Sequence, residues 1–575
     1  MVVFFMGGCA KSPQTQADLI LHGARVVTVD KDFSVREAIA IKDGKVLKVG
    51  RDSDILKLKG AGTEVVDLKG RMVLPGLMDS HVHPGSASMT EFDHAVPTME
   101  TVGDVLEYIR GRAEALGEGK WVNVSQVFIT RLREQRYPTR EELDRVAPKN
   151  PVVFSTGPDA SLNSLAMKLS GIDRNFQISD GGPGFVEKDG NGEPTGILRS
   201  CTRYVKSQDS GRQATEADRY RKTAELFHDY NSVGITSIGD RNAGAEDVRR
   251  YQKLLADGKL TVRISVSRHI DTIGPMEGIQ NRIREVAKDP LRKHDPMLQI
   301  IGIKTFLDGG MLTGSAYMRK PWGVSEIYAI RDPEYRGVLF IPRERLLPIV
   351  KTTLDGGMQF TAHSVGDGAV HTLLDVYEEL NRGRPVKENR PCITHSNFMS
   401  EEAVAKCAQL GVCVDIQPAW LYLDTRTLAA QFGYERLRWF QPLKSLFAAG
   451  AIAGGGSDHM QKVGSLRSIN PYNPFLAMQT AITRRARWYE GQLHPEEAIS
   501  REQAIRFYTS NNAYLLFRED EAGTLEVGKR ADLIVVDRDL LKCGQEEIGG
   551  TKVMRTYLDG KLVYDSASGP HTASN

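Results

Sequence analysis

The sequence predicts an α/β protein built on a (β/α)8 TIM barrel, with a large insertion after the first barrel strand and a small β-sandwich formed by the N- and C-terminal segments. Three observations predict this fold. Apolar runs alternate with charge-rich helical stretches through the middle of the 575-residue chain, which is typical of βα units. The runs number eight, as the strands of a TIM barrel do. Both chain ends instead read as short period-two strands broken by Asp-Gly or Gly turns.

The elements are predicted from these patterns in chain order. The sandwich strands fall within residues 17–21, 24–29, 38–41 and 45–49, and within 523–537 and 553–564 at the other end. The barrel strands cover approximately Val73–His83, Gly234–Asp240, Thr261–Ser267, Ile300–Phe306, Met358–Ser364, Cys392–Asn397, Val412–Pro418 and Ala451–Asp458. The gap between the first two barrel strands is too long for one helix, so an insertion fills it. Within it, the capping box Thr139-Arg140-Glu141-Glu142 predicts a helix start.

The domain boundaries follow from the same changes of pattern. They are residues 1–17 for a lipoprotein signal and tether, 18–74 for the first part of the sandwich, 75–514 for the barrel with its insertion at about 86–230, 515–567 for the second part of the sandwich, and 568–575 for a tail.

Charge and composition exclude one class of partner. Lys plus Arg total 75 against 73 for Asp plus Glu, a net charge of +2, so no strong field is available to attract nucleic acid. We expect a small-molecule substrate and no nucleic acid, with a homodimer as one option for the assembly. The hydrophobic content of 41% is ordinary for a globular protein.

The six cysteines show no Cys-x-x-Cys spacing and are too sparse for a disulfide framework, so we expect them to be free and mostly buried. Cys9 is different, because an apolar run and Gly7-Gly8 precede it as in a bacterial lipoprotein signal. It departs from that pattern in having no positive segment and only a short apolar run. A lipid-anchored location on the periplasmic side is the leading prediction and a cytoplasmic one the alternative. No apolar stretch elsewhere reaches the roughly 20 residues of a membrane span, so membrane contact would be by lipid anchor only.

A candidate metal site begins with His81 and His83. Alternate residues of a strand face the same side, so a His-x-His pair places two imidazoles where they can bind one metal ion. Later strands end with further ligand types, namely Lys304, His363, His395 and Asp458. Each has an ordinary structural explanation when taken alone. Their shared position at the C-terminal ends of ordered strands, where a TIM barrel carries its active site, favours a metal shell.

These motifs resemble the amidohydrolase superfamily, and within it the amidohydrolase family 3 group with N-substituted formamide deformylase-like enzymes. The resemblance covers about residues 18–565. The matching segments are Leu74–His83, Gly192–Arg199, Ile303-Lys304 with Asp308-Gly309, Ala362–Asp367, Gln417-Pro418, Gly456–Asp458 and Gly528–Leu533.

The resemblance implies which residues bind metal and what they do. His81, His83 and Asp458 would bind one divalent ion, Zn²⁺ in the first place, and His363 and His395 a second. Lys304 would bridge the two ions once its amine is carboxylated; a mononuclear site with Lys304 as a charged neighbour is the alternative. Asp458 would act as general base and then general acid in hydrolysis of a non-peptide C–N bond of the amide or formamide type.

Three rival functions stay open at this point. A deaminase or cyclic-amide hydrolase would use the same metal shell on a ring C–N bond. A metal-dependent esterase or prolidase-like activity is the next neighbour. A catalytically silent binding protein is the third, although none of the six ligands is missing here.

Two features bear on substrate choice. Relatives often carry Asp-Gly-His where this chain has Gly157-Pro158-Asp159-Ala160, without a histidine, so we expect a different substrate. His459, next to Asp458, is either catalytic or an exposed loop histidine.

Overall fold

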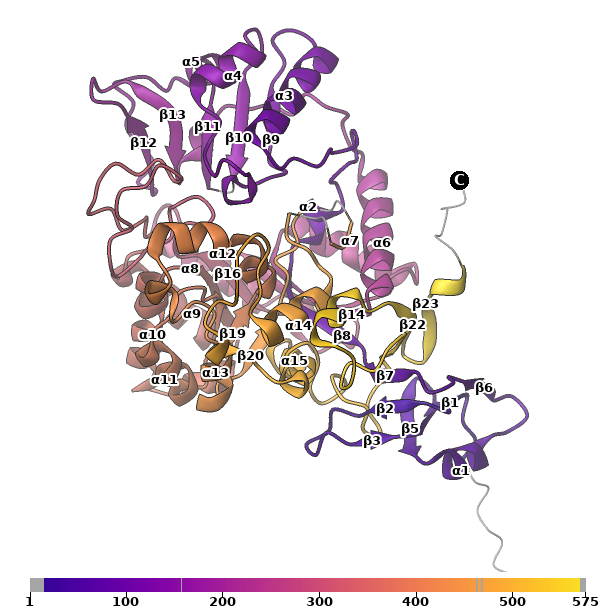
Figure 1. Cartoon of the computed structure of the whole chain (residues 1–575). Helices are drawn as coiled ribbons and strands as arrows, with labels where there is room; N and C mark the ends of the chain where they lie inside the picture. Colours follow the sequence, from indigo (N-terminus) through magenta and orange to yellow (C-terminus); the bar gives the residue numbers. More distant parts are fainter. Residues whose placement is uncertain (1–14, 157, 462–463, 467–468, 569–575) are drawn as a thin grey trace, which may run out of the picture.

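A computed structural model describes residues 15–156, 158–461, 464–466 and 469–568. The predicted lipoprotein signal at Cys9 lies outside the described residues. The structure has three parts: a central barrel, an inserted α/β layer on one side of it, and a β-sandwich at the opposite side (Figure 1). No helix among the described residues combines the length and apolar character that a membrane crossing requires.

The predicted TIM barrel is confirmed. Eight parallel strands form one sheet in the order β20-β19-β18-β17-β16-β15-β14-β8. They are β8 (Leu77–Val82), β14 (Ile235–Ala243), β15 (Arg263–His269), β16 (Leu298–Phe306), β17 (Gln359–Ser364), β18 (Cys392–His395), β19 (Cys413–Ile416) and β20 (Ala453–Gly455). The segment after β20 closes the ring on β8, because Asp458 N donates to His81 O at 2.8 Å and His83 N to His459 O at 2.8 Å.

Helices cover the outer side of the barrel and bury its apolar strands. Every residue of β8, β18 and β19 is buried, as expected where helices cover a parallel sheet. The covering helices include α7 (Ala245–Ala256), α8 (Met276–Ala287), α9 (Arg343–Asp355), α10 (Asp367–Asn381), α11 (Glu401–Leu410), α13 (Leu443–Ala449) and α15 (Arg501–Phe507). Their side chains and those of the strands join in the largest hydrophobic core of the described residues.

The predicted strand Val73–His83 is wrong as a single element, because it is two strands. Met72–Pro75 forms β7, which pairs with the C-terminal segment in the sandwich, whereas β8 pairs with β14 in the barrel. The chain changes sheet at Gly76, where an added Cβ would lie 2.2 Å from the Thr236 hydroxyl. Glycine therefore permits the close approach that carries the chain from sandwich to barrel.

Three predicted barrel strands end earlier than expected, each for a local reason. The sixth ends at His395, whose φ is +78°, and the eighth at Gly455, shortly before Asp458 with φ +53°. The seventh ends at Ile416, because Pro418 begins α12 (Pro418–Phe432) at a position that favours proline.

The sandwich joins both ends of the chain. One sheet has the order β5-β4-β1-β6, with strands Lys45–Gly50, Ala38–Lys42, Leu19–His22 and Glu64–Asp67. The other has the order β23-β22-β21-β7-β2-β3 and includes β21 (Leu533–Val536), β22 (Val553–Leu558), β23 (Lys561–Asp565), β2 (Arg25–Val27) and β3 (Val35–Arg36). A separate hydrophobic core fills the space between these sheets, with side chains such as Leu21, Ile39 and Leu533.

The insertion forms a layer of its own beside the barrel mouth (Figure 1). Its sheet has the order β12-β13-β11-β10-β9, with strands Phe185–Lys188, Pro194–Arg199, Asp159–Leu162, Val152–Thr156 and Val122–Val124. Helices α3 (Val102–Leu116), α4 (Arg140–Val146) and α5 (Ser164–Ser170) accompany it. The predicted helix start at Thr139 is confirmed, since its side chain accepts from Glu142 N in a complete capping box. Helix α6 (Glu216–Ser232) then leads back to the barrel.

Candidate metal centre

All six predicted site residues lie at the C-terminal ends of barrel strands. His81 is in β8 with His83 just beyond it, and Lys304, His363 and His395 are in β16, β17 and β18. Asp458 follows β20. The rings of His81 and His395 stack with centroids 4.9 Å apart, and those of His363 and His395 lie 4.5 Å apart. The barrel therefore brings together side chains that are up to 377 positions apart in the sequence.

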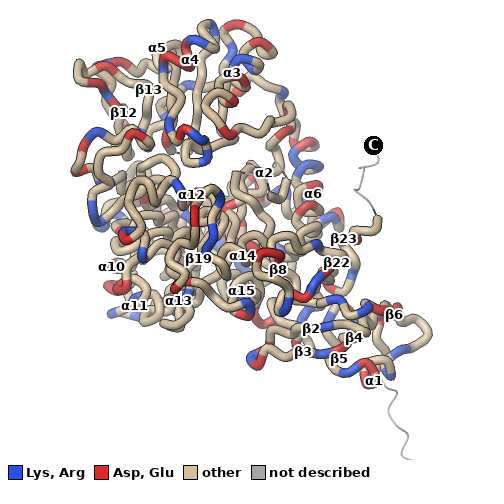
Figure 2. The backbone as a smooth tube through the Cα atoms, viewed as in Figure 1, with Lys and Arg blue, Asp and Glu red and all other residues tan. Residues whose placement is uncertain are grey.

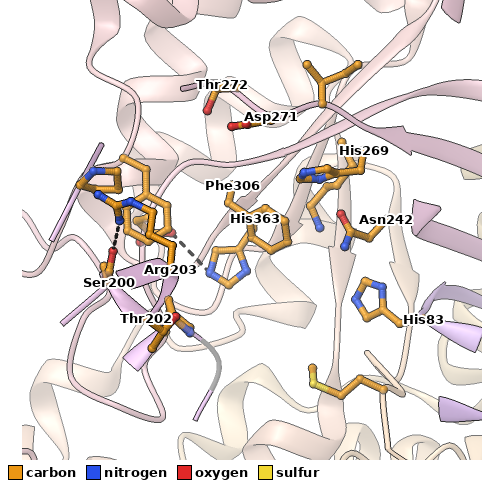
Figure 3. Close-up of a pocket in the computed structure, with 18 of the residues that line it drawn as sticks. His83, Ser200, Thr202, Arg203, Asn242, His269, Asp271, Thr272, Phe306 and His363 are labelled. Carbon is orange, nitrogen blue, oxygen red and sulfur yellow. Dashed lines mark hydrogen bonds and ion pairs between the residues drawn. The ribbon is translucent and has the colours of Figure 1, made fainter. Parts of the chain in front are cut away.

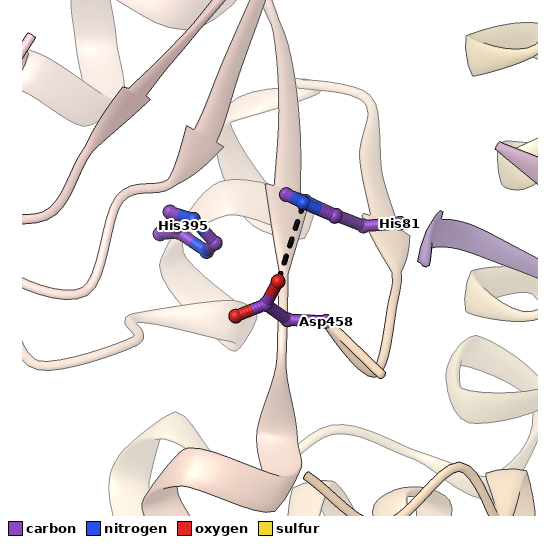
Figure 4. Close-up of side chains that lie close together, drawn as sticks. All are labelled: His81, His395 and Asp458. Atoms are coloured by element: carbon purple, nitrogen blue, oxygen red, sulfur yellow. Dashed lines mark ion pairs between the residues drawn. The ribbon is translucent and has the colours of Figure 1, made fainter. Parts of the chain in front are cut away.

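Three of these residues point their ligand atoms at one another. His83 Nε2 lies 3.2 Å from His81 Nε2 and 3.0 Å from Asp458 Oδ1, and the remaining edge, His81 Nε2 to Asp458 Oδ1, is 3.4 Å. His395 belongs to the same group, since one ligand atom each of His81, His395 and Asp458 lie within 4.8 Å of one another (Figure 4). One proton can satisfy a single edge of this triangle, whereas a cation at its centre satisfies all of them.

Partners behind the imidazoles decide which ring nitrogen is free. His81 Nδ1 lies 3.1 Å from Asp415 Oδ2, and His395 Nδ1 lies 2.7 Å from Gln417 Oε1. Both partners are acceptors, so each Nδ1 carries the proton and donates, which leaves Nε2 with its lone pair. Gln417 is itself oriented, because its Nε2 donates to Asp415 Oδ1 at 2.9 Å. Carboxylate and amide partners of this kind are typical of metal-binding histidines.

His363 differs from His81 and His395, because its partner is a backbone carbonyl in the loop after β16. Its Nε2 donates to Gly309 O at 3.3 Å, which leaves Nδ1 unprotonated. The neighbouring Asp308 carboxylate is buried and accepts the backbone N–H groups of Tyr317, Val365 and Gly366, each at 2.9 Å. Asp308 thereby ties this loop to the start of the segment that follows His363.

Lys304 is the least satisfied polar group of the site. Its side chain is fully buried, and no hydrogen-bond partner for Nζ is present among the described residues. The amine lies 4.9 Å from the centroid of the Phe306 ring. Burial lowers the pKa of Lys304 to about 8. A buried, unpaired amine is costly, because its hydration is lost without a compensating hydrogen bond.

Burial also keeps His81, His363 and His395 neutral. It lowers the pKa of His363 to about 3, and it holds the pKa values of His81 and His395 well below the usual 6.5. The charge of Lys304 acts in the same direction on all three. At neutral pH these three side chains are therefore neutral imidazoles, the form in which histidine binds metals.

Backbone strain gathers at the same place. His395, Ser396 and Asp458 have φ values of +78°, +45° and +53°, in the left-handed region that costs a non-glycine residue about 1–3 kcal/mol. Two of these three residues are predicted ligands. Such strain persists where the surroundings impose it, which is common at functional sites.

A cavity of about 1230 Å³ opens from these residues. Five of the six line it, and Figure 3 shows His83 and His363 at its base, with His269 and Asn242 from neighbouring strand ends. The insertion contributes the opposite wall through residues such as Ser200 and Arg203, so this layer covers the barrel mouth. Arg203 is paired with Asp180 at 2.6 Å.

Apolar side chains form much of the wall beside these polar groups. The apolar members of the lining include Phe128, Ile270, Ile273, Phe306, Met311, Leu312, Phe340, Trp420 and Met460. Trp420 stacks on His395 with 4.7 Å between centroids and 18° between planes. The cavity can thus hold a bulky apolar group next to the candidate metal residues.

Of the two alternatives for His459, a catalytic or an exposed loop histidine, the exposed loop histidine is wrong. His459 is fully buried, and its Nδ1 lies 2.8 Å from the Tyr230 hydroxyl. Its backbone forms the bridge to Val82 that closes the barrel, which explains the burial. The side chain is not among the described residues that line the cavity.

Sequence patterns did not predict the contacts that Asp415 and Asn470 make with the predicted ligands. A signal for Asp415 was available, because it is a carboxylate within the apolar run Val412-Cys413-Val414-Asp415-Ile416. The cysteine prediction is confirmed for the described residues, where five free cysteines include four buried ones.

Charges of both signs alternate along all three parts of the molecule (Figure 2). This agrees with the net charge of +2.

Comparisons with known proteins agree with the architecture. The model of the amidohydrolase family matches residues 64–564. The chain belongs to the amidohydrolase family. This amidohydrolase is 28% identical over 561 residues to an N-substituted formamide deformylase of Arthrobacter pascens, which covers 95% of this chain and 98% of that protein.

Solved structures show the same fold. An uncharacterized metal-dependent hydrolase from Pyrococcus horikoshii OT3 is similar with a TM-score of 0.64 and 22% identity, covering 92% of this chain and 99% of that one. An adenosine deaminase from Xanthomonas campestris, with bound zinc, has a TM-score of 0.53 and 16% identity, with 97% of each chain covered. The predicted resemblance is confirmed, and so is the predicted class of enzyme: this amidohydrolase is a hydrolase acting on carbon–nitrogen bonds.

Proposed function

We propose that this chain hydrolyses a non-peptide carbon–nitrogen bond of the amide or formamide type at a site for one or two divalent ions, zinc in the first place. His81, His83, Lys304, His363, His395 and Asp458 would hold the ions. The observation that carries the proposal is the triangle of His81 Nε2, His83 Nε2 and Asp458 Oδ1, with edges of 3.0 to 3.4 Å. The deformylase of Arthrobacter pascens supports the choice of bond.

The donor set fits such ions. Imidazole nitrogens and a carboxylate are the ligands that zinc takes in catalytic sites. The unpaired Lys304 amine fits once it is carboxylated: its nitrogen attacks carbon dioxide, an N–C bond forms, one proton leaves, and the product is an anionic oxygen ligand. With a pKa of about 8, part of the amine is neutral and nucleophilic at neutral pH. A bound divalent ion would supply water activation and carbonyl polarisation.

The protein's own groups account for the other steps. Asp458 accepts the proton of the attacking water and later donates it to the leaving nitrogen, as general base and acid. The partners Asp415 and Gln417 keep the His81 and His395 rings in the tautomer and orientation that binding needs. The inserted layer lines one side of the cavity through residues such as Ser200 and Arg203.

The test combines metal removal with an isosteric substitution. We expect chelation to abolish hydrolysis of N-substituted formamides and Zn²⁺ to restore it. Asp458→Asn, assayed with metal content measured, should lower kcat by roughly 10²- to 10⁴-fold, because the proton carrier is lost. Asp375→Asn, on the outer helix α10, is the matched control and should keep its turnover.

Amidase turnover that survives Asp458→Asn with metal bound would refute the proposal. A panel of formamides, N-acyl amino acids and cyclic imides assayed with the native enzyme separates the proposed bond type from that of a cyclic-amide hydrolase.

A further inference from the structure

Asn470 is a buried side chain that contacts Asp458 from the side opposite the histidines. It lies between β20 and α14 (Pro474–Thr483), and its Nδ2 donates to Asp458 O at 2.6 Å and to Asp458 Oδ2 at 3.2 Å. The other carboxylate oxygen, Oδ1, faces His81 and His83. The two oxygens of Asp458 therefore have different partners, and Asn470 distinguishes them.

The orientation of the Asn470 amide is fixed by groups that can only donate. Its Oδ1 accepts from Trp420 Nε1 at 3.1 Å and from Arg131 Nη2 at 3.3 Å. Indole and guanidinium nitrogens have no acceptor capacity. The amide oxygen must therefore face them, and the amide nitrogen must face Asp458. A flipped amide would place a donor against two donors and an acceptor against a carboxylate.

Arg131 brings this contact from the inserted layer. It belongs to the short helix η2 (Ile129–Arg131), and its guanidinium donates to both oxygens of Asp424 in α12, at 3.3 and 3.1 Å. Thr130 Oγ1 donates to the same carboxylate at 2.7 Å. All of these side chains are at least nine-tenths buried. A continuous chain of hydrogen bonds thus runs from the insertion through Arg131 and Asn470 to Asp458.

We propose that Asn470 is a positioning residue that fixes the rotation of the Asp458 carboxylate, and that Arg131 makes this position depend on the docking of the inserted layer. The inference rests on the proposed role of Asp458 as proton carrier. A carboxylate without its amide donor would turn about its last bond, and misplacement of a catalytic group by about 1 Å can cost 10²-fold in rate. Trp420 adds a link to His395, on which its ring stacks.

The sharpest variant is Asn470→Asp, because it keeps the acceptor for Arg131 and Trp420 and replaces only the donor by an oxygen. Asn470→Ala removes both functions. Arg131→Lys keeps a charge for Asp424 and loses the forked guanidinium, whose Nη2 donates to both Asp424 and Asn470. We expect both Asn470 variants to lower kcat by about 10- to 100-fold with KM within about threefold, and Arg131→Lys to show a smaller loss of the same kind.

The second readout is the visible absorption spectrum of the Co²⁺-substituted protein, which reports the geometry of the bound ion without turnover. It should change in both Asn470 variants. Asn389→Ala is the control: this buried asparagine also donates from Nδ2 to two groups, Leu354 O and Met358 O, far from the cavity. It should lose stability and keep both kcat and spectrum.

The outcomes separate the two proposals. If kcat and the Co²⁺ spectrum of folded Asn470→Asp both stay as in the native enzyme, or if Asn389→Ala reproduces the loss, the positioning role is refuted. Should Asn470→Ala fail to fold, Asn470→Asp and Arg131→Lys carry the same test. Full activity of Asp458→Asn would refute the role of Asp458 itself, whatever the Asn470 variants do.

Discussion

The hydrogen-bond partner of each histidine ring decides which of its nitrogens is free to bind a metal ion. His81 and His395 are alike in sequence terms, yet each has one nitrogen committed to an acceptor, Asp415 or Gln417, and one left over. His363 is committed through Nε2 to Gly309 O and so differs in the nitrogen it leaves free. The same imidazole group thus presents different atoms, because the second hydrogen bond of each ring differs.

The lowered pKa of His363 predicts a pH-dependent contribution to stability in the metal-free protein. Its pKa is about 3 when folded and close to 6.5 when unfolded, so between these values the unfolded state binds the extra proton. The stabilising effect is present above pH 6.5 and is lost as the pH falls. Relative to His363→Asn, the native protein should lose about 1.4 kcal/mol of unfolding free energy per pH unit below 6.5.

The difference between the two proteins is the quantity to measure, by urea unfolding of metal-free samples from pH 7 to 5. Buried carboxyl groups contribute with the opposite sign, since burial raises the pKa of Asp79 to about 7 and of Asp415 to about 6. Both proteins share these groups, so they cancel. A difference that does not vary with pH would contradict a neutral, buried His363.

Sequence patterns predicted the six candidate ligands because each ends a strand, and strand ends can be read from local hydrophobicity. They did not predict Asn470, whose role depends on Arg131, 339 residues away, and on Trp420 in another helix. Contacts of this kind arise when separate elements pack together. They leave no period or spacing in the sequence.

At the scale of the elements, local hydrophobicity predicts where strands lie but not which sheet each strand joins. The eight barrel strands were predicted because strands covered by helices on the outside are continuous apolar runs. The predicted domain boundary between residues 74 and 75 lies close to Gly76, but the break of the strand Val73–His83 was not predicted, since Leu74-Pro75-Gly76-Leu77 lies within one continuous apolar run. Only the different partners, β21 on one side and β14 on the other, separate the two strands.

The inserted layer shapes the cavity through Arg199, the last residue of β13. Its buried guanidinium donates to the carbonyls of Thr313 and Tyr328, in the long loop after β16, and to Glu187 at 3.1 Å. Met311, Leu312 and Thr313 of that loop line the cavity. Arg199 therefore fastens one wall of the cavity to the insertion.

We predict that Arg199→Lys raises KM for bulky substrates by about tenfold and changes kcat little. Lysine keeps the charge near Asp159 but cannot reach both carbonyls, so the wall loosens while the proton carrier stays in place. Steady-state kinetics with a large and a small formamide measure this. Arg484→Lys is the control, because Arg484 is likewise buried and donates to backbone carbonyls, three in its case, away from the cavity. Equal effects on KM in both variants would contradict the assignment.

At the scale of the whole molecule, the sandwich holds the two chain ends together against the barrel. Strand β7, just before the barrel begins, pairs along its length with β21, which follows the barrel. The motif Gly528–Leu533, which the sequence analysis identified, contributes to this contact. Its Asp532 carboxylate accepts two bonds from the buried Arg263 of β15, at 2.6 and 2.7 Å, and so joins the sandwich to a barrel strand.

The Arg263–Asp532 pair predicts a stability effect without a catalytic one. Both side chains are at least nine-tenths buried, and Arg263 keeps a second partner in Asp559 at 2.7 Å. Removing one charge of a buried pair costs about 3–5 kcal/mol, and Asp559 should reduce that loss in Asp532→Asn. The midpoint of urea unfolding should fall, while kcat per folded molecule stays unchanged, because neither residue lines the cavity.

Asp565→Asn gives the comparison within the same sandwich. Its partner Arg555 is partly exposed, and pairs of that kind contribute about 0–1 kcal/mol, so its unfolding midpoint should hardly move. A fall in kcat for Asp532→Asn at unchanged stability would contradict the prediction that this pair affects stability and not catalysis. It would mean that the sandwich reaches the chemistry through β15, whose far end carries His269 at the cavity.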